Sequence, residues 1–202
     1  MMSKRVLGWA GLILLIAECL LIILSWLLSA TMMEDVRSLL SSEGIRWLFG
    51  SYTSIVASPL LVWLLLLLIA GGAMFQCDVF KKHQGIRDRL ALRVSSVFIV
   101  IYLIIIVLLT LTPHAILLSA TGDLFPSAFS RSLIPLIAFG IILFSVTYGV
   151  MAGRMSSLSD ILEALSYGIR KGAPLIVLYI LFIQFIESLW FVFGAKLGYF
   201  FH

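Results

Sequence analysis

Long apolar blocks separated by short polar segments dominate the pattern of this chain. A helix that crosses a bilayer needs about 20 predominantly apolar residues. The pattern therefore predicts five transmembrane helices, at about residues 6–28, 59–77, 94–111, 133–151 and 174–195. The expected fold is an all-α integral membrane protein that forms a single transmembrane domain over residues 1–202.

Prolines mark the edges of several blocks, at Pro59, Pro113, Pro135 and Pro174. Because a proline in the first turn of a helix loses no intrahelical hydrogen bond, these positions predict helix starts. The first block is longer than the apolar core of a signal peptide, so we expect a retained helix.

Two connecting segments mix charged and apolar residues in the way that interfacial helices do. Residues 32–58 combine acidic and basic side chains with Trp47, a residue typical of the headgroup level. Residues 154–172 contain Asp160 and Glu163, spaced as in a capping box, followed by an apolar stripe. The sequence therefore predicts two interfacial amphipathic helices beside the five spans.

Composition supports a membrane protein and excludes several other classes. The chain is 62% hydrophobic and 12% charged, whereas soluble domains carry about 25% charged residues. The sequence has no basic face with interleaved aromatic residues, which is the pattern of a nucleic-acid-binding protein. Cys19 and Cys77 lie inside apolar blocks, so neither a disulfide nor a metal site is expected. No catalytic motif or phosphate-binding loop is present, so we expect no enzyme and no cofactor.

The distribution of positive charge predicts the orientation in the membrane. Ten of the 14 lysines and arginines fall in the N-terminal tail and in the segments after the second and fourth predicted spans. The positive-inside rule assigns that side to the cytoplasm. We therefore expect a cytoplasmic N-terminus and an external C-terminus. The basic run around Arg87 and Arg89 could also touch anionic lipid headgroups, although its role in topology explains it sufficiently.

Two carboxylates lie within predicted spans, where a charge is costly and commonly functional. Glu18 lies about 18 Å along the first span, and Glu187 about 20 Å along the fifth, at 1.5 Å per residue. Both spans run in the same direction, so the two side chains are expected at nearly the same depth. Gln184 lies one turn before Glu187, on the same helix face.

Several interpretations of these residues are open. The functional one is a proton or cation site that Glu18 and Glu187 share. Alternatively, each carboxyl is protonated or bonded to a hydroxyl and serves helix packing. A water-filled vestibule near Glu187, or a surface that contacts a partner subunit, would also explain them. Ser145, Thr147 and Tyr148 give the fourth span a polar face that could line a cavity, although bonding of Ser and Thr to the backbone four residues earlier is the simpler interpretation.

A series of short motifs follows a familiar order. LLSSEGIRW at residues 39–47 precedes an apolar helix that contains Gly71-Gly72. A fuller series runs through SLIPLI at 132–137, YGVMAG at 148–153, Ser159-Asp160, Ile176-Val177-Leu178 and Gln184-Phe185-Ile186. In order and spacing, these pieces resemble the middle of the aminobenzoyl-glutamate transporter (AbgT) family.

The resemblance implies a bacterial inner-membrane protein descended from secondary transporters of small anionic aromatic compounds, driven by a cation or proton gradient. Family members are longer, and their re-entrant hairpins have no counterpart in this sequence. Their Asn-Trp-Ser after Gln-Phe is replaced by Glu187-Ser188-Leu189-Trp190. The chain resembles a shortened form of the family.

We therefore predict a reduced AbgT-like secondary transporter protein that moves a small anionic solute with an ion or proton. Its predicted path is lined by Glu18, Gln184, Glu187 and Tyr148. The alternative is a non-transporting membrane scaffold or assembly subunit of a larger complex. Besides the lipid bilayer, the expected partners are a second copy of the chain or another membrane subunit.

Overall fold

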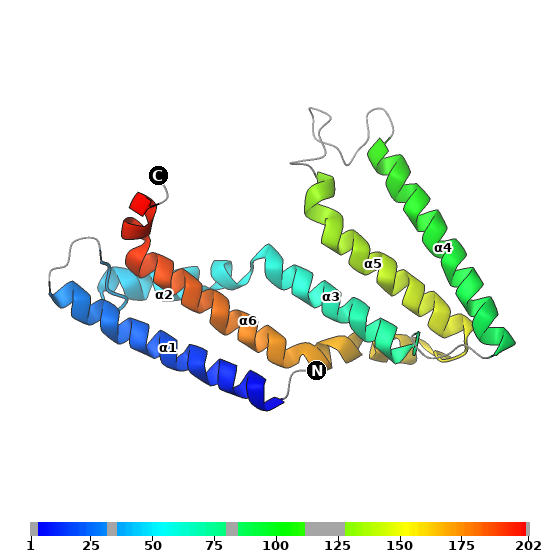
Figure 1. The fold of residues 1–202 in the computed structure, drawn as a ribbon, viewed down its shortest axis with the longest axis horizontal. Coiled ribbons are helices and arrows are strands. Elements are labelled where there is room, and N and C mark those ends of the chain that lie inside the picture. Colours follow the sequence, from blue (N-terminus) through cyan, green and yellow to red (C-terminus); the bar gives the residue numbers. More distant parts are fainter. Residues whose placement is uncertain (1–3, 32–35, 80–84, 112–127, 201–202) are drawn as a thin grey trace. The chain divides into compact units, whose positions relative to one another are not determined.

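The computed structural model describes residues 4–31, 36–79, 85–111 and 128–200. Within them the chain forms six helices and no strand (Figure 1). Five of the helices, all except α2, are long and apolar enough to cross a membrane. The predicted all-α membrane fold with five spans is confirmed. The six helices are α1 (Lys4–Ala30), α2 (Ser42–Val56), α3 (Pro59–Gln76), α4 (Ile86–Leu111), α5 (Ala128–Met151) and α6 (Leu158–Phe200).

Helix α1 shows why these segments suit a bilayer. Large apolar side chains project from all around it, and Trp9 and Ile13 are both more than 60% exposed. A helix that is apolar on every side is typical of a membrane span. Such exposure is unfavourable in water, whereas lipid chains solvate these side chains.

Helix α2 corresponds to the first predicted interfacial helix. Its N-cap is Ser41, whose hydroxyl accepts a hydrogen bond from the backbone N–H of Gly44 at 3.0 Å. Glu43 in the first turn adds a favourable charge at the positive end of the helix dipole. The helix ends at Val56, and α3 begins at Pro59, as the proline predicted. Residues 32–35 of the predicted segment lie outside the described residues.

The other predicted helix starts at prolines are wrong where the structure describes them. Pro135 lies inside α5, which begins at Ala128, and Pro174 lies inside α6. A proline in a helix interior costs one hydrogen bond. In lipid, breaking the helix would expose several unpaired peptide groups, which is worse. The proline at position 113 lies outside the described residues.

Because α6 continues through Pro174, the predicted helices at 154–172 and 174–195 form one helix of 43 residues. At 1.5 Å per residue its length is about 64 Å, roughly twice the 30 Å hydrocarbon thickness. The first turns of α6 carry the charged residues of the predicted interfacial segment. Only part of this helix can therefore lie in the hydrocarbon.

The chain divides into two compact units, residues 1–62 with 173–202, and residues 63–172. The expectation of a single domain stays a prediction. In the first unit, which we call unit 1, α1 packs along the C-terminal part of α6 (Figure 1). A side chain at Gly11 would contact Leu178, and Leu21 packs in one cluster with Val192. Residue numbers rise together on the two helices, so they run parallel.

In the second unit, unit 2, α4 and α5 form an antiparallel pair. The Tyr102 hydroxyl donates a hydrogen bond to the carbonyl of Leu136 at 2.8 Å. Toward the other end of the pair, the Arg87 Nε–H donates to the carbonyl of Met151 at 3.2 Å.

Unit 2 also brings α3 against the first turns of α6. A side chain at Gly72 would overlap the backbone of Gly168, and one at Gly168 would overlap the backbone of Leu68. Small residues at such a crossing allow two helices in a membrane to touch backbone to backbone.

Candidate functional site

The candidate site lies in unit 1, where α1 and α6 run side by side. Glu18 lies in the middle of α1, with apolar turns before and after it. The hydroxyl of Ser188 on α6 is fully buried and donates a hydrogen bond to Glu18 Oε1 at 2.7 Å. This bond joins residues 170 positions apart in the sequence.

Gln184 extends the contact by one turn of α6. Its Nε2 group donates a hydrogen bond to the Ser188 hydroxyl oxygen at 3.3 Å. The hydrogen bonds therefore form a chain: the Gln184 amide donates to the Ser188 hydroxyl, and that hydroxyl donates to the Glu18 carboxyl. A hydroxyl that donates and accepts at once fixes the direction of both bonds.

Two oxygen atoms of this cluster have no partner among the described residues. Glu18 Oε2 and Gln184 Oε1 are both buried, and neither accepts a hydrogen bond. A buried acceptor without a partner costs about 1–3 kcal/mol. The cluster thus has two acceptors without a partner among the described residues.

Glu187 lies one residue before Ser188 and therefore at the level of Glu18. It is half-buried, and within the described parts of the chain no hydrogen bond or ion pair to its carboxylate is found. Successive helix residues point about 100° apart, so Glu187 and Ser188 leave α6 in different directions. Among the four predicted site residues, the structure joins Glu18 and Gln184 through Ser188, and the role of Glu187 stays a prediction.

A groove of about 680 Å³ follows the same two helices toward the start of α1. Leu15 and Leu181 belong to its lining, one turn before Glu18 and Gln184 respectively. The remaining lining residues of α1 and α6 are apolar or glycine. The groove therefore reaches to within one turn of the polar cluster.

Tyr148 belongs to unit 2. Its side chain is fully buried in α5, and its ring stacks on Phe144 with centroids 6.4 Å apart. The guanidinium of Arg154 lies over the same ring, 5.2 Å from the centroid. Arg154 also donates to the Cys77 carbonyl and pairs with Asp88 at 3.6 Å. These contacts hold the ends of α3, α4 and α5 together.

Sequence reasoning missed both residues that organise these clusters. Ser188 carries little signal, because a serine in a membrane helix normally bonds back to its own helix. Arg154 has a better signal, since it follows Gly153, whose φ of 74° lies in the left-handed region. The Arg154 N–H donates to the Gly149 carbonyl, which completes a Schellman cap at the end of α5. A glycine and an arginine directly after a span are typical of such an end.

The residues that the structure describes contain no group of three or more His, Cys, Asp or Glu side chains that could hold a metal ion. Glu18 Oε2 and Gln184 Oε1 are the buried side-chain acceptors of unit 1 that lack a partner among the described residues.

Comparison with known proteins gives one result. The family model of the AbgT putative transporter family matches residues 76–200. The match includes α4, α5, α6 and three of the predicted site residues, whereas Glu18 and the motif at 39–47 precede it. No curated protein and no solved structure matches the chain. The matched region is more than half of the sequence, so the chain belongs to the AbgT putative transporter family.

Proposed function

We propose that this protein moves a small anionic solute across the membrane in exchange for, or together with, a proton bound at Glu18. Membership in a transporter family supports the transporter-like role. The observation that supports a proton site at Glu18 is the pair of unpartnered acceptors, Glu18 Oε2 and Gln184 Oε1. The neighbouring Ser188 hydroxyl cannot donate to them, because it already donates to Glu18 Oε1.

A proton fits these acceptors better than a metal cation does. Hard cations take about six oxygen ligands, and this cluster offers two open oxygens. A proton on Glu18 Oε2 converts an acceptor into a donor, and the oxygen of Gln184 is the open acceptor nearest to it along the hydrogen-bonded chain. The same proton removes a charge that would cost several kcal/mol in the hydrocarbon.

The groove between α1 and α6 supports a route to this proton site. It ends one turn from Glu18 and Gln184, and Glu187 lies on the neighbouring face of α6. We assign the path to Glu18, Gln184 and Glu187. Tyr148 is the weakest member of the predicted path, because the contacts with Phe144 and Arg154 already explain its burial.

The orientation that we propose puts the N-terminus in the cytoplasm and the C-terminus outside, in a bacterial inner membrane. The excess of lysine and arginine in alternate loops supports this orientation. The parallel packing of α1 and α6 supports termini on opposite sides of the membrane, since the first and fifth of five successive spans run in the same direction.

Purified protein in liposomes tests the proposal. With an imposed pH gradient, the wild type should take up a small anionic aromatic solute such as aminobenzoyl-glutamate, and Glu18→Gln should lose the gradient dependence. Ser188→Ala should shift the pH at which uptake is half-maximal, because the carboxyl loses its hydrogen-bond donor. The matched control is Glu43→Gln, which removes an exposed carboxylate of α2 and should leave uptake unchanged.

Two results would contradict the proposal. One is full gradient-driven uptake in Glu18→Gln. The other is a folded wild type with no uptake in any proton or sodium gradient, which would favour the assembly-subunit alternative.

A further inference from the structure

Residues 36–41 of unit 1, an irregular segment directly before α2, lie over the line along which α1 and α6 pack. The backbone N–H of Arg37 donates a hydrogen bond to the Val192 carbonyl of α6 at 3.2 Å. The backbone N–H of Leu39 donates to the Ser25 hydroxyl oxygen of α1, also at 3.2 Å. Segment 36–41 is therefore attached to both helices and bridges them.

The side chain of Leu39 fills the space between the two helices. It is 2% exposed and packs in one cluster with Leu21 of α1 and Val192 of α6. The Ser25 hydroxyl that accepts the Leu39 N–H is fully buried and donates to the Ile22 carbonyl. Both functions of this hydroxyl are thus used, and together they fix the position of Leu39.

The helical repeat places Leu39 directly beyond the polar cluster of Glu18. Glu18 and Ser25 are seven residues apart, so they lie about 20° apart around α1 and about 10 Å apart along it. Ser188 and Val192 are four residues apart, which corresponds to about 40° and about 6 Å on α6. The contacts of segment 36–41 therefore lie on the same helix faces as the cluster, one to two turns nearer the C-terminal ends of both helices.

Helix α2 also holds segment 36–41 in place. The ring of Trp47 stacks on Phe191 of α6, with centroids 4.5 Å apart. A side chain at Gly44 would overlap the carbonyl groups of Ser38 and Leu39, so the start of α2 touches the backbone of the segment. Leu39 is thus held by α2 as well as by α1 and α6.

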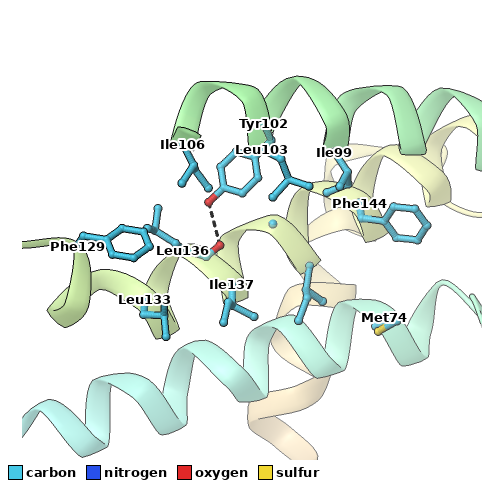
Figure 2. A pocket seen from close by; sticks show the side chains of 12 residues that line it. Met74, Ile99, Tyr102, Leu103, Ile106, Phe129, Leu133, Leu136, Ile137 and Phe144 are labelled. Atoms are coloured by element: carbon cyan, nitrogen blue, oxygen red, sulfur yellow. Dashed lines mark hydrogen bonds between the residues drawn. The ribbon is translucent and has the colours of Figure 1, made fainter. Parts of the chain in front are cut away.

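The α4–α5 pair of unit 2 shows that the space between two helices need not be filled in this way. An apolar cavity of about 500 Å³ lies between these helices, with Met74 of α3 at its edge (Figure 2). Every residue found to line it belongs to α3, α4 or α5. Leu39 instead comes from an irregular segment outside the helices between which it packs. Its position is therefore a specific feature of unit 1.

Segment 36–41 can leave the two helices without unwinding them. Its hydrogen bonds to α1 and α6 come from its own backbone N–H groups, and the Ser25 side chain and the Val192 carbonyl only accept them. Breaking both bonds leaves the hydrogen bonds within each helix in place. The departure of Leu39 would uncover the turns next to Glu18.

We propose that Leu39 closes the path to Glu18 from the C-terminal ends of α1 and α6, and that Ser25 is the positioning residue that holds it there. A proton passes between Glu18 and this side of the membrane only after Leu39 has left the space between the helices. This inference rests on the proposed proton site and adds the residue that regulates access to it. With the orientation proposed above, the closed side is the outside.

Thiol accessibility tests the closure without any gradient or solute. Cys19→Ser with Cys77→Ser removes both cysteines of the chain, and Ser188→Cys then places a single thiol beside Glu18. The probe is the membrane-impermeant cation 2-(trimethylammonium)ethyl methanethiosulfonate, added in turn to intact cells that express the protein and to inverted vesicles. Glu43→Cys, at an exposed position of α2, identifies the membrane side on which segment 36–41 lies.

From that side, Ser188→Cys should react at least tenfold more slowly than Glu43→Cys, because Leu39 covers it. Adding Leu39→Gly should raise the rate at Ser188→Cys at least tenfold. Leu40→Gly is the matched control, since Leu40 is the next residue of the same segment and is 49% exposed. This control should leave the rate unchanged.

Ser25→Ala provides a second test, also if Leu39→Gly does not fold. It keeps the Leu39 side chain and removes the acceptor that positions it. The rate at Ser188→Cys should rise about fivefold, the effect of one lost hydrogen bond. Ser54→Ala is its control, because Ser54 is exposed and bonds to the Ser51 carbonyl of its own helix.

Equal rates in Leu39→Gly and Leu40→Gly would overturn the proposal. A Ser188→Cys variant that reacts as fast as Glu43→Cys while Leu39 is present would also overturn it. Neither result bears on the proton site, which the uptake of Glu18→Gln tests. Full uptake in Glu18→Gln would leave a measured closure in place and would remove only its proposed purpose.

Discussion

The polar clusters of the two units are built on opposite principles. In unit 2, Arg154 is surrounded by partners: a carbonyl at the end of α3, the Asp88 carboxylate and the face of Tyr148. In unit 1, the Glu18 carboxyl has one partner, Ser188, and one open oxygen. A satisfied cluster serves to fix helix ends, whereas an open one can gain and lose a proton. The comparison sets the structural use of polar groups in unit 2 beside the proton site that we propose in unit 1.

The largest change in the free energy of unfolding is expected at the backbone contact between α3 and α6 in unit 2. Gly72→Leu would force a side chain into the backbone of Gly168 and should destabilise the protein by about 3 kcal/mol or more. Gly71→Leu is the control, because no atom of another residue lies within 4 Å of the position that a Cβ at Gly71 would take. Equilibrium unfolding in mixed micelles measures both. A Gly72→Leu variant as stable as the control would show that α3 and α6 do not touch in the folded protein.

The next largest effect is expected from Arg154→Ala. Both partners of the Arg154–Asp88 pair are about a quarter exposed, so the loss should be near 2 kcal/mol rather than the 3–5 of a fully buried pair. Arg170→Ala breaks an ion pair with Glu163 whose side chains are 58% and 60% exposed. That control should cost less than about 0.5 kcal/mol. If both variants lose the same stability, Arg154 is not the structural centre that its contacts indicate.

Unlike Gly72→Leu and Arg154→Ala, Glu18→Leu should not lower the stability of the protein. Replacing an incompletely paired buried polar group by an apolar one is neutral or stabilising, and Ser188 can then bond back to its own helix. We expect unfolding stability to stay equal or to rise by about 1 kcal/mol, while proton-driven uptake is lost. A loss of 2 kcal/mol or more would place Glu18 in the structural class with Arg154.

The smallest change in stability is expected from Glu187→Gln. The described residues provide no partner for this carboxylate, so its unfolding free energy should change by less than about 0.5 kcal/mol. Uptake should nevertheless fall if Glu187 lines the path beside Gln184. Unchanged uptake would remove Glu187 from the path and leave Glu18 as its only acidic residue.

The five spans could be predicted because the length of an apolar run reports directly on bilayer thickness. The helix starts at Pro135 and Pro174 could not be predicted correctly. Proline usually begins a helix, but in lipid a broken helix would leave peptide groups unpaired, so α5 and α6 continue through their prolines. The pattern also could not predict the contact of Gly72 with Gly168, since it depends on which helices become neighbours.

The candidate site shows the same limit. Two of its members, Glu18 and Gln184, stand out as polar residues in apolar spans. The nearly equal depth of Glu18 and Glu187 could be estimated from helix rise alone. Which residue would meet Glu18 depends on the rotation of α6 about its axis. A one-residue step turns the contacting position by about 100°, which selects Ser188 rather than Glu187. No single-sequence pattern fixes that rotation.

The contact between Glu18 and Ser188 has a consequence for biosynthesis. The two residues are 170 positions apart, and ribosomes add about 5–20 residues per second. Roughly 10 to 30 s therefore pass between the synthesis of Glu18 and that of its partner. Throughout that interval, α1 carries a glutamate whose hydrogen-bond donor does not yet exist. A chain released before α6 would keep that carboxyl in the membrane without Ser188 as its donor.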